Sequence, residues 1–215
     1  MSRARLQRDR PGGHDGAMHT LSTVRRGVAA AVVALLAIVA FPPGAGADEI
    51  EQTDPVGDVP YQRGDITRIR VIHRSGNVDL RVRTRLGGQP LNNWPNRATH
   101  IRWRIDIGGP AGPDYYADLR LLSGVDTLFT GRLRSAHTGQ IIPGCGANQS
   151  DPNGQTIVTA NGNEYRYQFL RGCISAPEQF RARAALVWDN GLPNVGPVYT
   201  DHAPNGGQLP PVATG

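Results

Sequence analysis

Hydrophobic and polar residues alternate along much of this chain, and a period of two predicts β-strands that bury one face and expose the other. In residues 78–86, aliphatic side chains at most even positions alternate with Asp79, Arg81 and Arg83 at odd positions. Further strands are predicted over residues 67–74, 100–107, 115–121, 125–133, 155–160, 164–174 and 180–188. After residue 47, no apolar stripe repeats at the 3.6-residue spacing of an amphipathic helix. The pattern therefore predicts an all-β protein.

Turn-forming residues separate the predicted strands. Residues 75–77 (Ser-Gly-Asn) and 161–162 (Asn-Gly) favour hairpins, because these residue types tolerate the backbone angles of tight turns. About eight short strands with frequent turns are typical of a single antiparallel β-sandwich, here expected to be jelly-roll-like. Residues 48–65 are acidic and turn-forming, so we expect the first strand to follow them.

The N-terminal segment has the features of an export signal. An uncharged run of 15 residues, 27–41, follows Arg25 and Arg26 and is followed by a Pro-Pro pair and Ala-Gly-Ala. A basic flank, a short apolar run and small residues describe a signal peptide that is removed. A retained membrane anchor is the alternative, but 15 residues are fewer than the ~20 that a spanning helix needs. We expect a secreted protein, extracellular or associated with the cell wall.

This signal divides the chain into three parts. Residues 1–47 are predicted to be a helical signal peptide, with Met18 as an alternative start. Residues 48–189 are the β-sandwich domain. Residues 190–215, rich in Pro, Gly and Asn, are an irregular tail that is partly packed or disordered.

Cleavage changes the charge of the protein that is exported. The whole chain has 23 basic residues, all of them Arg, and a formal net charge of +5. Residues 48–215 hold 17 Arg against 16 Asp plus Glu, which is a net charge of +1. The basic excess therefore lies in the removed segment and gives no support to nucleic acid as a partner. Membrane association is not expected after cleavage.

The two cysteines, Cys145 and Cys173, both lie in the exported part. A redox-active pair usually has the spacing C-x-x-C, and a zinc site needs further ligands nearby. Two cysteines in an oxidising compartment favour a structural disulfide. This bond would close a loop with 27 residues between its ends and stabilise the fold by ~3–4 kcal/mol.

Five aspartates are candidate calcium ligands. Asp54, Asp58 and Asp65 lie within twelve residues, and Asp106 and Asp114 flank a Gly-rich loop. Calcium binds six to eight oxygen atoms, which loop carboxylates and backbone carbonyls supply. The alternative is that these aspartates form turns by accepting hydrogen bonds from nearby backbone amides. Both interpretations remain open at this point.

Arginines alternate with apolar residues in two of the predicted strands. If these strands pair, Arg81, Arg83, Arg102 and Arg104 lie on one face, where their guanidinium groups would bind a wall polymer, an acidic glycan or phospholipid headgroups. The alternative is a solvated face on which Asp79, Asp106 and Asp118 balance the charge.

The sequence gives no positive support to catalysis. It contains no H-E-x-x-H, no G-x-S-x-G and no P-loop. Both methionines, Met1 and Met18, precede residue 47, so Met/His haem ligation is excluded after cleavage. We expect no cofactor other than calcium.

Several short motifs carry a family resemblance. They are Asp54-Pro-Val-Gly-Asp58, Asp65-Ile66, the strand-terminal Asp106, Pro113-Asp-Tyr115 and Asp201-His-Ala-Pro204. With the Cys pair, they make the chain resemble exported actinobacterial proteins of unknown function that open with D-P-x-G-D. The resemblance implies a β-sandwich like that of DOMON domains and carbohydrate-binding modules.

These observations together predict a secreted, non-catalytic module of the cell envelope that binds a glycan or an anionic wall polymer. Two alternatives are a secreted hydrolase with an unrecognised site and a structural or protein-interaction domain.

Overall fold

The computed structural model describes residues 48–86, 99–108, 112–122, 125–149, 156–189 and 199–215. The predicted signal peptide, residues 1–47, lies outside the described residues, as do residues 190–198 of the predicted tail. In the described part of the chain, the only helical segment is the short 3₁₀ helix η1 (Arg171–Ile174). The prediction of an all-β protein is confirmed. None of the described segments is a helix long and apolar enough to cross a membrane.

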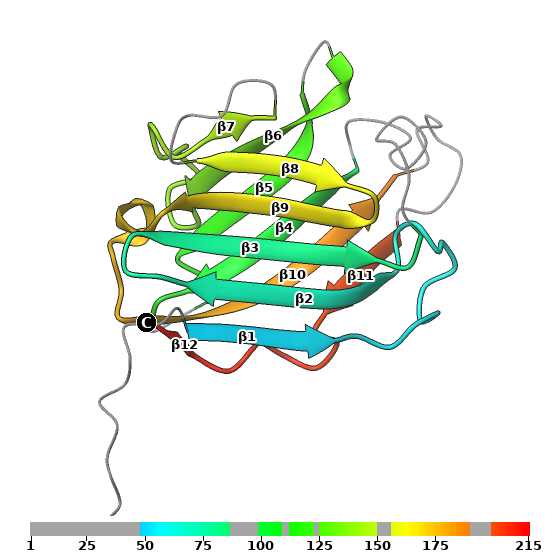
Figure 1. Cartoon of the computed structure of the whole chain (residues 1–215), viewed down its shortest axis with the longest axis horizontal. Coiled ribbons are helices and arrows are strands. Elements are labelled where there is room, and N and C mark those ends of the chain that lie inside the picture. Colours follow the sequence, from blue (N-terminus) through cyan, green and yellow to red (C-terminus); the bar gives the residue numbers. More distant parts are fainter. Residues whose placement is uncertain (1–47, 87–98, 109–111, 123–124, 150–155, 190–198) are drawn as a thin grey trace, which may run out of the picture. The chain divides into compact units, whose positions relative to one another are not determined.

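The strands form two antiparallel sheets (Figure 1). Sheet A has the order β1-β2-β3-β9-β8, and sheet B has the order β11-β10-β4-β5-β6-β7, with β12 paired to β10. The strands of sheet A are β1 (Asp48–Thr53), β2 (Ile66–His73), β3 (Asn77–Thr84), β9 (Glu164–Leu170) and β8 (Ile157–Asn161). The strands of sheet B are β11 (Tyr199–Ala203), β10 (Gln179–Trp188), β4 (His100–Asp106), β5 (Tyr115–Leu122), β6 (Val125–Ser135), β7 (Ala147–Asn148) and β12 (Val212–Ala213).

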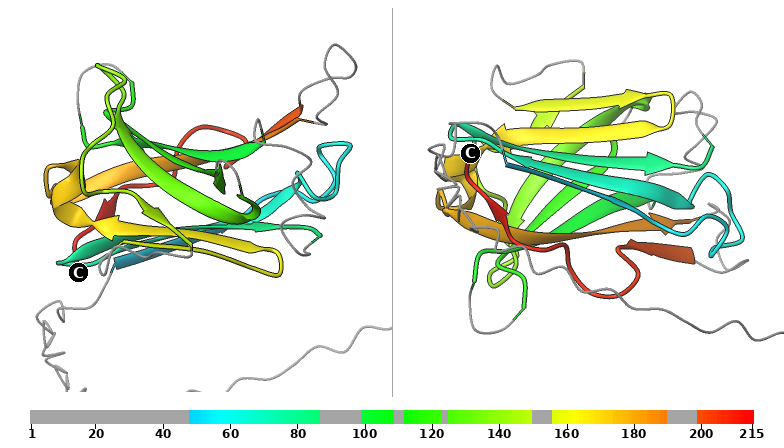
Figure 2. Two further views of the ribbon diagram at one scale, coloured as in Figure 1. Left: turned by 90° about the horizontal axis from the view of Figure 1, so that it is seen from above. Right: turned by 60° about the horizontal axis from the view of Figure 1, so that its bottom comes forward.

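One hydrophobic core lies between the two sheets, which Figure 2 shows as two layers. Alternate residues of each strand enter it, among them Leu80 and Tyr167 from sheet A and Trp103 and Leu119 from sheet B, all at most 1% exposed. Full burial of such a side chain contributes about 1.5–3 kcal/mol. Because side chains alternate across a strand, a shift of one residue would move these groups to solvent, and the core therefore fixes the register.

The two sheets lie close together at Gly131 of β6. A Cβ atom at this position would lie 2.7 Å from side-chain atoms of Tyr167 and Val158, which belong to sheet A. Any larger residue would push these side chains away, so glycine is required for the sheets to meet here.

Two boundaries differ from the expectations. Residues 48–53 form the edge strand β1, so the prediction that the first strand follows residue 65 is wrong. This strand lacks the alternating pattern because little of it is buried; Glu49 and Glu51 instead pair with Arg70 and Arg68 of β2 at 2.7 and 3.1 Å. The second difference concerns the strand predicted over 164–174, which ends at Leu170 and is followed by η1.

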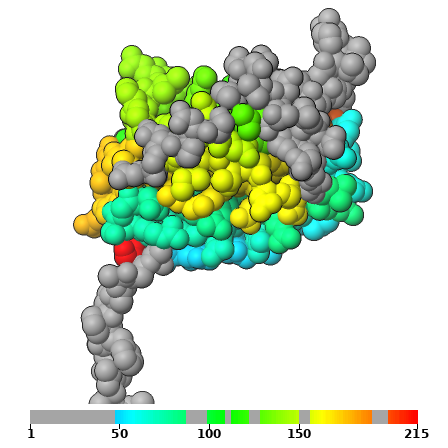
Figure 3. Space-filling model, turned by 45° about the horizontal axis from the view of Figure 1, so that its top comes forward, coloured from blue at the N-terminus to red at the C-terminus, as the bar shows by residue number. Residues whose placement is uncertain are grey.

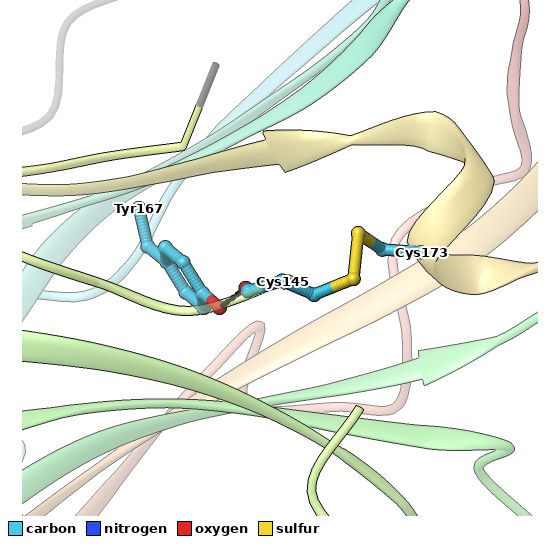
Figure 4. Close-up of a disulfide and its surroundings, with 3 residues drawn as sticks. All are labelled: Cys145, Tyr167 and Cys173. Atoms are coloured by element: carbon cyan, nitrogen blue, oxygen red, sulfur yellow. Dashed lines mark hydrogen bonds between the residues drawn. A yellow bond between two sulfur atoms is a disulfide. The ribbon is translucent and has the colours of Figure 1, made fainter. Parts of the chain in front are cut away.

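The predicted disulfide is confirmed (Figure 4). It joins Cys145, which precedes β7, to Cys173 in η1, with the two Cα atoms 5.9 Å apart. The hydroxyl of Tyr167 donates a hydrogen bond to the backbone carbonyl of Cys145. The bond therefore ties the end of sheet A to the edge of sheet B.

Candidate functional site

The four arginines predicted to share a face lie on two different sheets. Arg81 and Arg83 belong to β3 in sheet A, whereas Arg102 and Arg104 belong to β4 in sheet B. The inner faces of both sheets share the core, so these arginines lie on the two opposite outer faces. Strands β3 and β4 do not pair, and the condition on which the single cluster depended is not met.

The outer face of sheet A is electrically balanced. Figure 3 shows β3, β8 and β9 side by side on one surface of the molecule. On this face, Asp79 is fully buried and lies 2.8 Å from Arg81 and 2.9 Å from Arg166. Although burial alone would raise it, these hydrogen bonds hold the pKa of Asp79 below its ordinary value. On the same face, Glu49, Glu51 and Glu164 pair with Arg70, Arg68 and Arg81.

The outer face of sheet B carries a large excess of positive charge. Its strand register brings seven arginines from β4, β5, β6 and β10 to the same side. We call these residues the arginine face: Arg102, Arg104, Arg120, Arg132, Arg134, Arg181 and Arg183. Among the described side chains, the only carboxylates at strand positions on this side are Asp106 and Asp118.

Three of these arginines form ion pairs with the same carboxylate. Asp118 is 2% exposed and accepts hydrogen bonds from Arg102, at 2.6 Å, and from Arg134, while Arg120 lies 3.6 Å away. Burial lowers the pKa of Arg120, and the charges of Arg134, Arg102 and Arg132 lower it further although Asp118 opposes them. The guanidinium groups are therefore close enough to repel one another.

The other four members of the arginine face make no ion pair with any described carboxylate. They are Arg104, Arg132, Arg181 and Arg183, from three different strands. Arg104, Arg132 and Arg181 are exposed. A shallow pocket at the end of this face is lined by Arg181, Asp106, Gly108 and Pro211. The face thus offers solvent-accessible cations in an array.

A second cluster consists of aspartates from two segments of the chain, the β1–β2 connection and β11. Carboxylate oxygens of Asp54, Asp58 and Asp201 all lie within 4.8 Å of one another. Asp54 and Asp58 follow β1, and Asp201 belongs to β11. Asp65, which precedes β2, contacts the carboxylate of Asp58 and accepts a hydrogen bond from the backbone amide of Gly57 at 2.8 Å. We call these four residues the aspartate cluster.

Burial and mutual repulsion destabilise the charged forms of this cluster. Burial, and next the charge of Asp58, raise the pKa of Asp54 to about 6. Burial and the charges of Asp58, Asp54 and Asp65 raise the pKa of Asp201 to about 7, although a hydrogen bond from the amide of Ile66 opposes the shift. Burial also raises the pKa of Asp65.

The other two predicted calcium ligands do not join this cluster. Asp201 is level with Ile101, near the start of β4, whereas Asp106 ends that strand. Asp106 accepts a hydrogen bond from the amide of Gly108, and Asp114 accepts one from Ile107, both at 2.9 Å. These two aspartates stabilise the backbone around the loop, as the turn-forming alternative predicts.

Asp201 is the member of the aspartate cluster that the local sequence did not reveal. It is 136 positions beyond Asp65, and only the pairing of β11 with β10 brings it to this end of the sheets. Its signal was an acidic residue at the buried parity of a strand, where a carboxylate needs a specific partner.

Comparisons with protein-family models, curated proteins and solved structures give no match.

Proposed function

We propose that the chain is an exported, non-catalytic β-sandwich of jelly-roll type that binds an anionic cell-envelope polymer through the arginine face. The observation that supports it most is the imbalance, among the described side chains at strand positions, of seven arginines against two aspartates on the outer face of sheet B. Export is inferred from the signal-like segment of residues 1–47, and the absence of catalysis from the lack of catalytic motifs. The ligand is a polymer with repeated phosphate or carboxylate groups.

The spacing of a β-sheet suits such a ligand. Neighbouring strands lie about 4.8 Å apart, and residues on one face of a strand recur about every 6.7 Å. Arginines on β10, β4 and β6 therefore form a lattice of cations over which a chain of regularly spaced anions can lie. Each guanidinium presents several donors in a plane and can bind a phosphate or carboxylate through two hydrogen bonds.

The partial pairing on this face divides the arginines into two groups. Asp118 forms ion pairs with Arg102, Arg120 and Arg134 and so fixes their positions. Arg102 also lies 5.1 Å from the centre of the Tyr116 ring. The unpaired arginines lie around them and supply charge that no described carboxylate neutralises. A polymer would bind these unpaired groups first, because it displaces no internal ion pair there.

The proposal is tested by matched charge reversals on the two sheets. Arg104→Glu changes an exposed, unpaired arginine on the arginine face, and Arg83→Glu changes an exposed arginine on the outer face of sheet A. Binding to a purified polyglycerol-phosphate chain is measured by calorimetry at several salt concentrations, with uncharged dextran as a second probe.

We expect Arg104→Glu to weaken binding to the polyphosphate about tenfold, which corresponds to about 1.4 kcal/mol, and Arg83→Glu to leave it nearly unchanged. The double variant Arg104→Glu/Arg181→Glu should weaken binding further and reduce its dependence on salt. Equal loss with Arg83→Glu, or equal affinity for dextran and polyphosphate, would contradict the proposal.

A further inference from the structure

We infer that the aspartate cluster, Asp54, Asp58, Asp65 and Asp201, binds a hard divalent cation of the calcium class. This site lies apart from the arginine face and does not depend on the proposed polymer binding. It differs from the set predicted from the sequence, because Asp201 takes the place of Asp106 and Asp114. The inference depends on geometry, on unpartnered buried oxygen atoms and on charge.

The cluster has the arrangement of a ligand set. Three of its carboxylates place oxygen atoms within 4.8 Å of one another, which allows one ion to contact all three. Hydrogen bonds hold the group in position: the amide of Ile66 donates to Asp201, and the side-chain amide of Asn205 donates to Asp58. The donors come from the β1–β2 connection and from β11, so a bound ion would join sheet A to sheet B.

Two buried oxygen atoms in the cluster lack hydrogen-bond donors. Asp54 is 6% exposed and its Oδ2 has no partner, and Asp65 is 0% exposed and its Oδ1 has no partner. A buried carboxylate oxygen without a donor is costly, and such groups in folded proteins nearly always have a partner. The Asp58 carboxylate lies against that of Asp65, so the unpartnered groups belong to the same cluster.

Among the residues that the structure describes, no basic side chain neutralises the four carboxylates. Arg85 lies 3.8 Å from Asp65 and is 41% exposed at its side chain, and Arg183 acts on Asp54 only at longer range. The cluster can reduce its repulsion by binding protons or by binding a cation. A divalent ion would replace the protons and at the same time supply the missing partners for the buried oxygen atoms.

The donor chemistry favours calcium. The described donors are all oxygen atoms, whereas zinc sites are built mainly from Cys and His. His202 follows Asp201 at the opposite parity of β11, on the side of Arg183 and Arg104. Calcium accepts irregular geometry and ligands from flexible connections more readily than magnesium does, and magnesium requires a near-ideal octahedron.

The test measures binding and stability with the purified chain at pH 7.5. Calorimetry with calcium chloride, and separately with magnesium chloride, gives the stoichiometry and affinity. Thermal unfolding is followed with calcium and with EDTA. Asp58→Asn removes the exposed member of the cluster, whose loss should leave the fold intact, and Asp106→Asn is the matched control outside the cluster.

We expect one calcium per chain, an increase in Tm of about 5 °C at saturation, and weaker binding of magnesium. Asp58→Asn should lose at least about tenfold in calcium affinity, and Asp106→Asn should bind as the parent chain does. Absence of calcium binding at millimolar concentration, or unchanged binding by Asp58→Asn, would overturn the inference.

Discussion

The outer faces of the two sheets use the same basic residue in opposite ways. On sheet A, Asp79, Glu49, Glu51 and Glu164 lie among the arginines, and four arginines pair with them: Arg68, Arg70, Arg81 and Arg166. On sheet B, Asp118 alone pairs with three arginines, and four more have no described partner. The number of arginines on a face therefore says little about its charge; the positions of the carboxylates decide it.

The difference should appear most strongly when the central aspartate of each face is neutralised. Asp118→Asn leaves Arg102, Arg120 and Arg134 without a carboxylate partner among the described residues, so we expect a loss of about 3 kcal/mol in the free energy of unfolding. Asp79→Asn leaves Arg81 with Glu164, so we expect a smaller loss, about 2 kcal/mol. Urea unfolding of both variants measures the two values. An equal loss would show that Glu164 contributes nothing to stability as a second partner of Arg81.

The pH dependence of sheet A gives a second comparison. Because the folded pKa of Asp79 lies below its ordinary value of 3.8, its stabilising effect is present above that value and is lost as the pH falls through the folded pKa. The parent chain should therefore lose stability below about pH 4 more steeply than Asp79→Asn does. Urea midpoints between pH 2 and pH 6 measure this, and parallel curves would contradict it.

The smallest expected effect is a gain in stability. Arg132 is exposed on the arginine face and contributes to the repulsion that lowers the pKa of Arg120. Arg132→Gln should raise the free energy of unfolding by about 0.5 kcal/mol, because it removes this repulsion without placing a second carboxylate opposite Asp118. Thermal unfolding at low salt measures the gain, which high salt should remove. A loss of stability would contradict the prediction and show that repulsion among these arginines does not destabilise the fold.

The sequence predicted the elements of the fold better than their arrangement. Alternation located the strands around Leu80 and Trp103 because one face of each is buried and the other is not. It missed β1, whose Glu49 and Glu51 are held by ion pairs and backbone hydrogen bonds at a sheet edge rather than by burial. The pairing of Cys145 with Cys173 followed from there being only two cysteines.

The candidate sites show why arrangement is harder to predict. Local sequence cannot say which strands are neighbours, so Arg81 and Arg102 were expected on one face although β3 and β4 lie in different sheets. For the same reason Asp54, Asp58 and Asp65 were found by their short spacing, whereas Asp201 required the pairing of β11 with β10. Sites built from distant segments depend on strand order, which the period of two does not encode.

The disulfide would hold the chain together after a single proteolytic cleavage between its two cysteines. Between Cys145 and Cys173 lie β7, β8 and β9, and β7 and β8 are the outermost strands of their sheets. A single protease nick anywhere from Gly146 to Gly172 would leave both fragments covalently joined. Such a nicked molecule would migrate as one band on a non-reducing gel and as two after reduction, and its outermost strands would stay tethered to the body of the protein.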